Sequence, residues 1–347
     1  MIVIDFSQLV FNNLYIVKKN FVKTRLVNTE LNKSNLIKTY EKKEFNIEDS
    51  IQFIKHLVLN QILSHAKDFK DETEIVLAID YSSWRKYEFQ DSNGKVLYKA
   101  KRHASREDDG FDWETFWSEI GKFQDELKEH FPFVFVSTKY AEGDDVIGTL
   151  AEYIYERNIT NNRNDSFVII SSDKDFVQLQ RYKNVRQFSP TTRKEIKCVN
   201  PNNELMWLIL KGDVADGIPN VKSPDDAFMT KNTVRMWNST KIWEHIENNT
   251  VHDSLLITEE LQKNFQRNKK LIDLRECPEK IKKEIIRSFE ESRAALKTKS
   301  QLGLFNFLIK NKMKNLFDRM GDFKKFFNPI EEDSSKKNLN QFIKIKK

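Results

Sequence analysis

The sequence predicts an α/β fold built on a twisted, mainly parallel sheet with flanking helices. Apolar runs rich in β-branched residues occur at 2–5, 75–80 and 167–173, and each run ends in an aspartate. Runs of this composition are typical of strands buried on both faces of a parallel sheet. Segments with apolar residues at helical spacing lie between them, at 48–69 and 112–130. This alternation of strand and helix is the pattern of α/β proteins.

The other elements of the N-terminal part follow in order. The segment from about 17 to 46 is rich in Lys, Asn and Thr, and we expect an exposed insertion there. The next helix has its apolar positions at Ile51, Ile54, Leu57, Val58 and Ile62. Residues 81–110 show no core pattern. A short strand at 133–136 precedes an acidic helix that begins near residue 142.

A second, mostly helical part follows. Beyond about residue 195 strand signals largely disappear, and helical patterns occupy 254–275, 279–296 and 299–328. We therefore expect three regions, with the first two joined near Pro190. They are an α/β domain at 1–195, a mostly helical domain at 196–330, and a basic tail at 331–347.

Composition is consistent with a cytoplasmic protein that binds nucleic acid. The 347 residues carry a formal net charge of +6. The two cysteines, Cys198 and Cys277, match no metal or redox spacing, which favours reduced thiols in a cytosolic protein. The first strand begins next to Met1, which leaves no room for a signal peptide. No apolar stretch approaches the roughly 18 residues that span a bilayer, so we expect no membrane partner.

The acidic residues predict a metal centre. In an open α/β sheet the binding crevice lies beyond the carboxyl ends of the strands, so the three strand-end aspartates should meet there. Like charges at close range repel unless a cation neutralises them. The full set of candidate ligands is Asp5, Asp80, Glu142, Asp144, Asp145, Asp173, Asp175, Asp213 and Asp216. Ligands that are all oxygen suit Mg²⁺ or Mn²⁺, and their number suggests two ions.

Each acidic segment also has a simpler interpretation. A single aspartate after a strand is often a helix N-cap, and acids at a helix start favour the positive end of the helix dipole. Asp213 and Asp216 alone could belong to an ordinary turn. The metal centre is favoured because five such segments fall at the same end of one predicted fold.

The segment 81–110 is the second informative region, because basic residues alternate with aromatic ones in it. Cations that follow a phosphate backbone and rings that stack on bases are what single-stranded nucleic acid requires. The segment follows Asp80 directly, so it should lie over the metal centre. The alternative is a solvated loop with lysine and arginine stems on the surface. If the segment binds nucleic acid, the residues in contact with it would be Arg85, Lys86, Tyr98, Lys101 and Arg106.

The order of these motifs resembles the structure-specific 5′ nucleases, which include flap endonucleases and the 5′-exonuclease domains of bacterial DNA polymerases. The motifs are Asp5, Asp80, the basic aromatic segment, Glu142-Gly-Asp144-Asp145, Ser-Asp173-Lys-Asp175 and Gly-Asp213-x-x-Asp216. Within the family, the phrases Ile-Asp-Phe-Ser-Gln, Ile-Ser-Ser-Asp and Ile-Leu-Lys-Gly-Asp are most similar to the RNase H branch of T-even bacteriophages.

The resemblance implies that 1–195 is a PIN-like metal-dependent nuclease domain with a helical arch near 81–110. It also implies that 196–330 is a helical DNA-binding domain with a helix-three-turn-helix element. It implies a 5′-3′ exonuclease or flap endonuclease with RNase H activity, which removes primers from RNA–DNA and DNA duplexes in lagging-strand replication. Two Mg²⁺ ions, replaceable by Mn²⁺, would serve as cofactors. We expect a monomer, in the host cell cytoplasm if the chain is phage-encoded.

Residue roles follow from the same resemblance. The first ion would be bound, directly or through water, by Asp5, Asp80, Glu142 and Asp144. The second group would be Asp173, Asp175 and Asp216, with Asp145 and Asp213 as supporting acids. The arch bases at the scissile phosphate would be Lys99 and Arg102, and the turn would contact nucleic acid at Gly212 and Gly217.

The turn departs from the family pattern in two ways. It has Gly217 where Asn is frequent and Asn220 where Gly is frequent, and no glycine-rich hairpin follows Val221. These departures put a bound monovalent ion and the grip on downstream duplex in doubt, and they favour the phage type.

Two other classes of protein remain as alternatives. A metal-dependent phosphatase would also place an aspartate after a strand, but many such enzymes have a second one two residues later, where this chain has Ser7. A non-catalytic nucleic-acid-binding protein on the same fold would be expected to have lost some of the acids.

The C-terminal tail suggests a protein partner. Residues 334–347 follow the acidic group 331–333 and carry apolar residues among lysines, at Leu339, Phe342, Ile343 and Ile345. Such a segment could bind in a groove of a sliding clamp or a single-strand-binding protein, or it could pack on its own domain.

Overall fold

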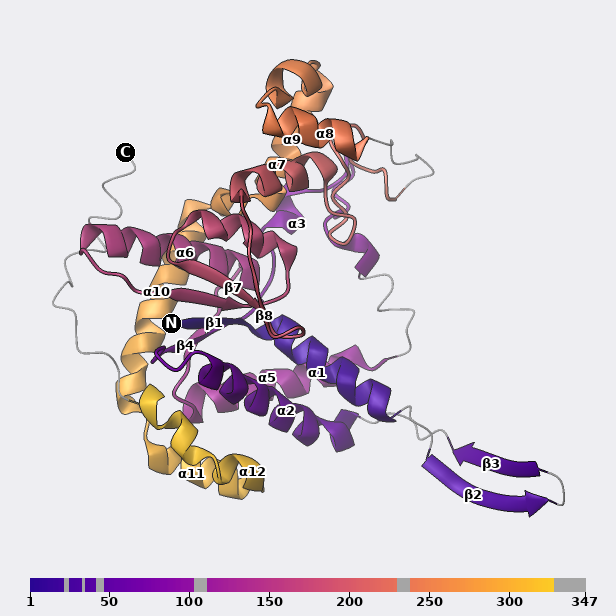
Figure 1. Cartoon of the computed structure of the whole chain (residues 1–347), viewed down its shortest axis with the longest axis vertical. Helices are drawn as coiled ribbons and strands as arrows, with labels where there is room; N and C mark the ends of the chain where they lie inside the picture. The colour runs from indigo at the N-terminus through magenta and orange to yellow at the C-terminus, as the bar shows by residue number, and fades with distance from the viewer. Residues whose placement is uncertain (22–24, 33–34, 42–46, 103–110, 230–237, 328–347) are drawn as a thin grey trace.

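The computed structural model describes residues 1–21, 25–32, 35–41, 47–102, 111–229 and 238–327. Its main feature is a six-stranded sheet that carries helices on both faces (Figure 1). In spatial order the strands are β5 (Val134–Val136), β4 (Ile75–Ala78), β1 (Ile2–Asp5), β6 (Phe167–Ile170), β7 (Val185–Ser189) and β8 (Lys194–Ile196). All neighbouring pairs are parallel except β7 and β8. The predicted α/β class and its mainly parallel sheet are confirmed.

The alternation of side chains along the strands explains why both faces are covered. Ile2 and Ile4 belong to one apolar core, and Val3 belongs to another on the opposite face. The first core lies under α1 (Phe6–Phe21), α2 (Ile47–Asp68) and α5 (Trp113–His130), and the second under α6 (Gly143–Thr160) and α10 (Glu279–Ala295). All four residues of β1 are buried, as its uninterrupted apolar run predicted.

The segment expected as an exposed insertion contains regular structure. Its first residues complete α1, and β2 (Arg25–Asn32) pairs in antiparallel fashion with β3 (Asn35–Glu41) as a sheet of its own. A hairpin paired only with itself needs no long apolar run, so its polar composition concealed it.

The helical unit is formed by three helices around a separate core. They are α7 (Pro201–Lys211), α8 (Ser239–Glu247) and α9 (Glu259–Ile272), and they lie beyond one end of the sheet (Figure 1). Phe89, Leu97 and Tyr98 pack into this core. The segment 81–110 therefore contributes core residues although it shows no core pattern, because these apolar side chains follow no helical or strand period.

The predicted boundary residues lie at the last two strands of the sheet. Residue 195 lies inside β8, and Pro190 lies in the turn that joins β7 to β8. Residues Leu304, Phe307 and Phe323 belong to the core of the α/β domain. They come from α11 (Gln301–Lys310) and the 3-10 helix η5 (Met320–Phe326), with the short helix α12 (Lys314–Phe317) between them. An apolar helical face in a sequence does not tell which surface it covers.

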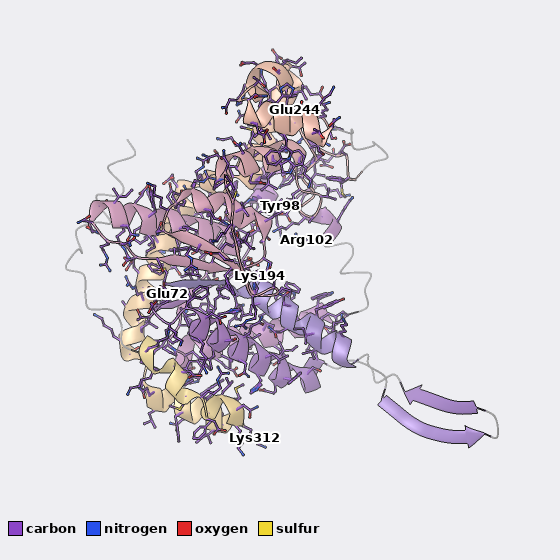
Figure 2. All side chains as sticks on the ribbon, in the orientation of Figure 1. Glu72, Tyr98, Arg102, Lys194, Glu244 and Lys312 are labelled. Carbon is purple, nitrogen blue, oxygen red and sulfur yellow. The ribbon has the colours of Figure 1, made fainter. Side chains whose placement is uncertain are left out.

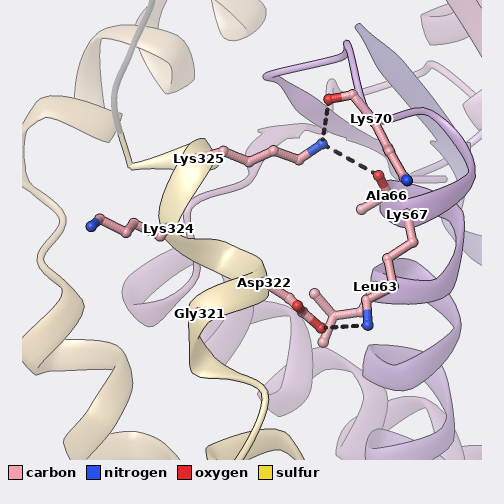
Figure 3. A pocket seen from close by; sticks show the side chains of 8 residues that line it. All are labelled: Leu63, Ala66, Lys67, Lys70, Gly321, Asp322, Lys324 and Lys325. Carbon is pink, nitrogen blue, oxygen red and sulfur yellow. Dashed lines mark hydrogen bonds and ion pairs between the residues drawn. The ribbon is translucent and has the colours of Figure 1, made fainter.

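A cavity of about 540 Å³ lies between the end of α2 and η5 (Figure 3). Two of the lysines that line it have partners within the chain. Lys325 donates hydrogen bonds to the carbonyls of Ala66 and Lys70, and Lys67 pairs with Asp322 at 3.2 Å. These contacts of Lys325 and Lys67 therefore hold the C-terminal helices against α2.

None of the helices in the described part of the chain is long and apolar enough to cross a membrane.

Candidate active site

Three aspartates meet at the carboxyl edge of the sheet, as predicted. Asp5 ends β1, which lies between β4 and β6, and Asp80 and Asp173 follow those two neighbours. Asp5 is 9% exposed and accepts hydrogen bonds from the Gln8 amide at 3.0 Å and the Ser171 hydroxyl at 3.4 Å. Burial raises the pKa of Asp5 to about 7, with further contributions from the charges of Asp80 and Asp173.

The start of α6 brings three more acids to the same edge. Glu142 and Asp145 form a capping box, in which each side chain accepts the backbone N–H of the other residue. Asp80 accepts a hydrogen bond from the Gly143 amide, so the second strand-end aspartate is tied to this helix start. Burial, together with the charge of Asp173, raises the pKa of Asp144 well above its ordinary value. Asp144 thus lies within the electrostatic reach of the neighbouring strand end.

Asp173 and Asp175 form the second acidic group. Asp173 caps the 3-10 helix η1 (Lys174–Arg181) and accepts the Asp175 amide at 3.0 Å. Burial raises the pKa of Asp175 to about 7, followed by the charges of Asp173, Asp213 and Asp216. The helical unit therefore delivers its two aspartates next to the group that follows β6.

The glycines of the 212–220 turn have a structural reason. Gly212 and Gly217 have φ values of 73° and 74°, in the left-handed region that favours glycine. A Cβ at Gly217 would lie 2.8 Å from the Leu97 carbonyl oxygen, so the backbone at Leu97 packs directly on the turn. Asp213 closes the turn through the amides of Ala215 and Asp216 and pairs with Lys174 at 2.9 Å.

Lys99 and Arg102 lie at the acids. The Lys99 ammonium is 2.5 Å from Glu142 Oε1 and 3.7 Å from Asp216, and Arg102 is 2.8 Å from Asp216. The Lys99 amide also donates to the Asp216 carbonyl at 2.8 Å. Burial opposes ionisation of Glu142, but Lys99 and Arg85 outweigh it and lower the pKa of Glu142 to about 2.

The other predicted arch contacts have different positions. Arg85 is 2% exposed and lies beneath the acids, and Tyr98 is equally buried, with its hydroxyl donating to Glu142 at 2.8 Å. Their burial is contrary to the direct nucleic-acid contact expected of them. The alternation of basic and aromatic residues in a sequence does not show which of these side chains will be buried. Lys86 is half-buried and Lys101 is exposed. Arg106 lies outside the described residues.

Figure 2 shows Tyr98 and Arg102 where the helical unit meets the α/β domain. Sequence reasoning missed the neutral partners of the site. Ser83 donates to Glu142 at 2.6 Å, and Gln8 accepts from the Ser171 hydroxyl at 3.1 Å. Gln8 and Ser171 stand within the two motif phrases Ile-Asp-Phe-Ser-Gln and Ile-Ser-Ser-Asp, which was the available signal.

The donor set fits divalent cations. Every acid at the site offers oxygen, and Asp5, Asp144 and Asp175 have pKa values raised by burial, in the manner of carboxylates that a cation would neutralise. Within the described residues, no three His, Cys, Asp or Glu side chains are grouped as ligands of one ion. Glu142, Asp213 and Asp216 are instead paired with Lys99, Lys174 and Arg102. Binding an ion would require these pairs to rearrange.

A parallel α/β sheet with an acidic carboxyl edge, basic side chains over it and a helical unit beside it defines a phosphodiester hydrolase of the nuclease type. Comparison with known proteins gives the family. Residues 1–205 match the model of the 5′-3′ exonuclease N-terminal resolvase-like domain, and residues 200–323 match that of the C-terminal domain of T4 RNase H. The chain belongs to the 5′-3′ exonuclease family.

Two relatives agree with this assignment. The ribonuclease H of Enterobacteria phage T4 is 30% identical over 285 residues, which cover 79% of this chain and 88% of the relative. The crystal structure of the T5 D15 protein co-crystallised with metal ions shares the fold, with a TM-score of 0.53 and 16% identity over 84% of this chain and 98% of that one. The protein is a 5′-3′ nuclease that acts on nucleic acid.

Proposed function

We propose that this nuclease removes RNA primers and adjoining DNA from 5′ ends and flaps during lagging-strand replication, using two Mg²⁺ ions that Mn²⁺ can replace. The observation that carries the proposal is the junction of two acidic groups with two arch bases. The charge of Asp173 contributes to the raised pKa of Asp144. Lys99 contacts Glu142, and Arg102 contacts Asp216. A single edge of the sheet therefore offers ligands for two cations and positive charge for one phosphate.

The proposed ligands divide as the elements do. The acids after β1, after β4 and at the start of α6 would hold one ion, and Asp173, Asp175 and Asp216 would hold the other. When bound, two such ions supply a water of lowered pKa and neutralise the leaving 3′ oxygen. Asp145 and Asp213 would not bind an ion directly, because Asp145 caps α6 and Asp213 closes its own turn.

Lys99 and Arg102 would act on the substrate. Lys99 and Arg102 would leave Glu142 and Asp216 in order to contact the scissile phosphate. Their positive charges would then offset the charge that grows on the phosphoryl oxygens in the transition state. Lys99 is the better placed of the two, because its backbone amide is hydrogen-bonded to the Asp216 carbonyl. Its φ of 55° is that of a turn residue.

The helical unit would hold duplex. Its turn contributes Asp213 and Asp216 to the acidic edge, so a duplex bound along α7 to α9 would present its 5′ end to the same place. Lys86 and Lys101 remain the proposed phosphate contacts of the arch, and Lys101 already lies 4.5 Å above the Phe228 ring. We propose that the protein works as a monomer in the cytoplasm of its host cell.

A cleavage assay tests the proposal. Labelled 5′-flap DNA and an RNA–DNA duplex are incubated with the protein and Mg²⁺, Mn²⁺ or EDTA, and a chromogenic phosphate ester is run in parallel. We expect 5′-3′ cleavage of both nucleic acids with Mg²⁺ and Mn²⁺, none with EDTA and no turnover of the ester. Turnover of the ester alone would favour a phosphatase, and binding without cleavage would favour a non-catalytic protein.

The basic tail is proposed to bind a replication partner, either a sliding clamp or a single-strand-binding protein. Residues 331–347 lie outside the described part of the chain, so the proposal rests on their sequence. Deletion of 334–347 should leave cleavage of a bare flap and the melting temperature unchanged, while stimulation by the partner is lost. A fall of several degrees in melting temperature would show instead that the apolar side chains of the tail are buried in its own domain.

A further inference from the structure

The carboxyl end of α9 makes an unusual contact with the acidic edge. The last four carbonyls of a helix have no partner within the helix. In α9 two of them are satisfied by side chains from the α/β domain and the arch. Arg85 Nε donates to the Leu271 carbonyl at 2.8 Å, and Gln178 Nε2 donates to the Ile272 carbonyl at 3.1 Å. Each donor comes from a segment that also carries or contacts one acidic group.

Arg85 joins this helix end to the first acidic group, which consists of the acids after β1, after β4 and at the start of α6. It stands at the start of the short helix α3 (Arg85–Glu88), below the helical unit (Figure 1). Its guanidinium lies 3.2 Å from Glu142 Oε2 and binds both oxygens of Asp145, at 3.0 and 2.9 Å. Asp145 in turn accepts the Glu142 amide at 3.0 Å. Both the side chain and the backbone of Glu142 are therefore held by one buried network.

Gln178 does the same for the second acidic group. It lies in η1, three residues after Asp175, and is fully buried. Its amide donates to the Asp175 carbonyl at 2.9 Å as well as to α9, and its Oε1 accepts the Leu274 amide at 3.0 Å. The two acidic groups are thus fixed to neighbouring carbonyls of the same helix.

We propose that Arg85 is a positioning residue of the metal site, and that it and Gln178 use the carboxyl end of α9 as a common anchor that keeps the two ligand groups in register. The inference rests on the proposed role of Glu142 as a ligand. Arg85 contacts neither the substrate nor an ion, but it fixes one oxygen of Glu142 so that the other faces Lys99. A planar guanidinium can serve three acceptors at once, which a lysine ammonium at the same place cannot do with the same geometry.

The test compares Arg85→Lys with a matched control that joins the same two elements. Lys270 of α9 pairs with Glu88 of α3 at 2.5 Å on the surface, away from Glu142, so Lys270→Ala removes a link without touching the acids. Mn²⁺ binding is measured by titration calorimetry without substrate, alongside the melting temperature and kcat and KM on a 5′ flap. We expect Mn²⁺ to bind 10- to 100-fold more weakly to Arg85→Lys, as for other partners that orient ligands. We expect kcat to fall with KM little changed, and Lys270→Ala to behave like wild type.

Gln178→Ala extends the test to the second group. It should weaken Mn²⁺ binding while leaving the Lys99–Glu142 pair untouched, which provides a second variant if Arg85→Lys folds poorly. The inference is overturned if a folded Arg85→Lys protein binds Mn²⁺ within twofold of wild type and differs only in melting temperature. Failure of the wild type to bind Mn²⁺ would instead overturn the proposed metal site itself, so the two ideas fail separately.

Discussion

Replacing Asp5 with asparagine should make the metal-free protein more stable and should abolish its nuclease activity. Asp5 is almost fully buried against Asp80 and Asp173, which is unfavourable for its charge. Asparagine has nearly the same shape and no charge. Its amide oxygen can accept the Gln8 N–H, and its amide nitrogen can donate to the Ser171 hydroxyl, so both hydrogen bonds of Asp5 have replacements.

The expected gain follows from the pKa. The folded state raises the pKa of Asp5 from 3.8 to about 7, so folding favours the protonated form. The cost of the ionised form is fully present above pH 7 and is lost as the pH falls toward the unfolded value. At 1.36 kcal/mol for each pKa unit, Asp5→Asn should raise the free energy of unfolding by about 4 kcal/mol at pH 8 and by roughly 2 kcal/mol at pH 5. For a chain of 347 residues, the gain at pH 8 corresponds to about 5 °C in melting temperature.

The assay is denaturant unfolding followed by tryptophan fluorescence, in EDTA at pH 8 and pH 5, with Asp125→Asn on the exposed surface of α5 as the control. Saturating Mg²⁺ should shrink or reverse the difference at pH 8, because the variant lacks a ligand of the first ion and gains less stability from the ions than the wild type does. The reasoning would be refuted if Asp5→Asn were no more stable than wild type in EDTA at pH 8, or if its gain were as large at pH 5.

Three further outcomes are expected. Asp144→Asn should abolish cleavage while substrate binding survives, measured by gel assay and binding titration; retention of more than about a tenth of wild-type turnover would contradict its role between the two groups. Lys99→Ala with Arg102→Ala should lower kcat about 100-fold or more with a smaller effect on KM, and a rise in KM alone would make both residues simple backbone anchors. Gly217→Ala should lower the melting temperature, because it places a side chain at a φ of 74° and 2.8 Å from a carbonyl oxygen. Gly121→Ala, which meets nothing within 4 Å in the middle of a helix, should instead be neutral or stabilising by up to about 1 kcal/mol.

The extent to which sequence could predict the fold depended on the length and composition of each element. β1, β4 and β6 were found because both faces of each are buried, which leaves an uninterrupted apolar run. β7 and β8 were not found, because β7 carries Arg186 and Gln187 side by side, and β8, an edge strand, has only three residues, two of them charged. The helices α11 and α12 were found as helices, but their packing on the α/β domain was not, because an amphipathic face does not name its partner.

The acids of the candidate site could be found from sequence because of topology alone. Aspartates that follow neighbouring parallel strands must meet at one edge, whatever the details of packing. The acids at the start of α6 and in η1 lie in the segments that follow β5 and β6. The order of motifs then indicated the family that the comparisons establish.

Tertiary structure alone decided which basic residues are buried and what they hold. Arg85 and Lys101 have the same kind of neighbours in the sequence, yet one lies beneath Glu142 and the other faces solvent. The difference arises because α9, nearly two hundred residues away, supplies the carbonyl that makes a buried guanidinium at Arg85 tolerable. Strand ends are determined locally, and so the sequence shows where the acids gather. Burial of a charge depends on partners that only the folded chain brings together.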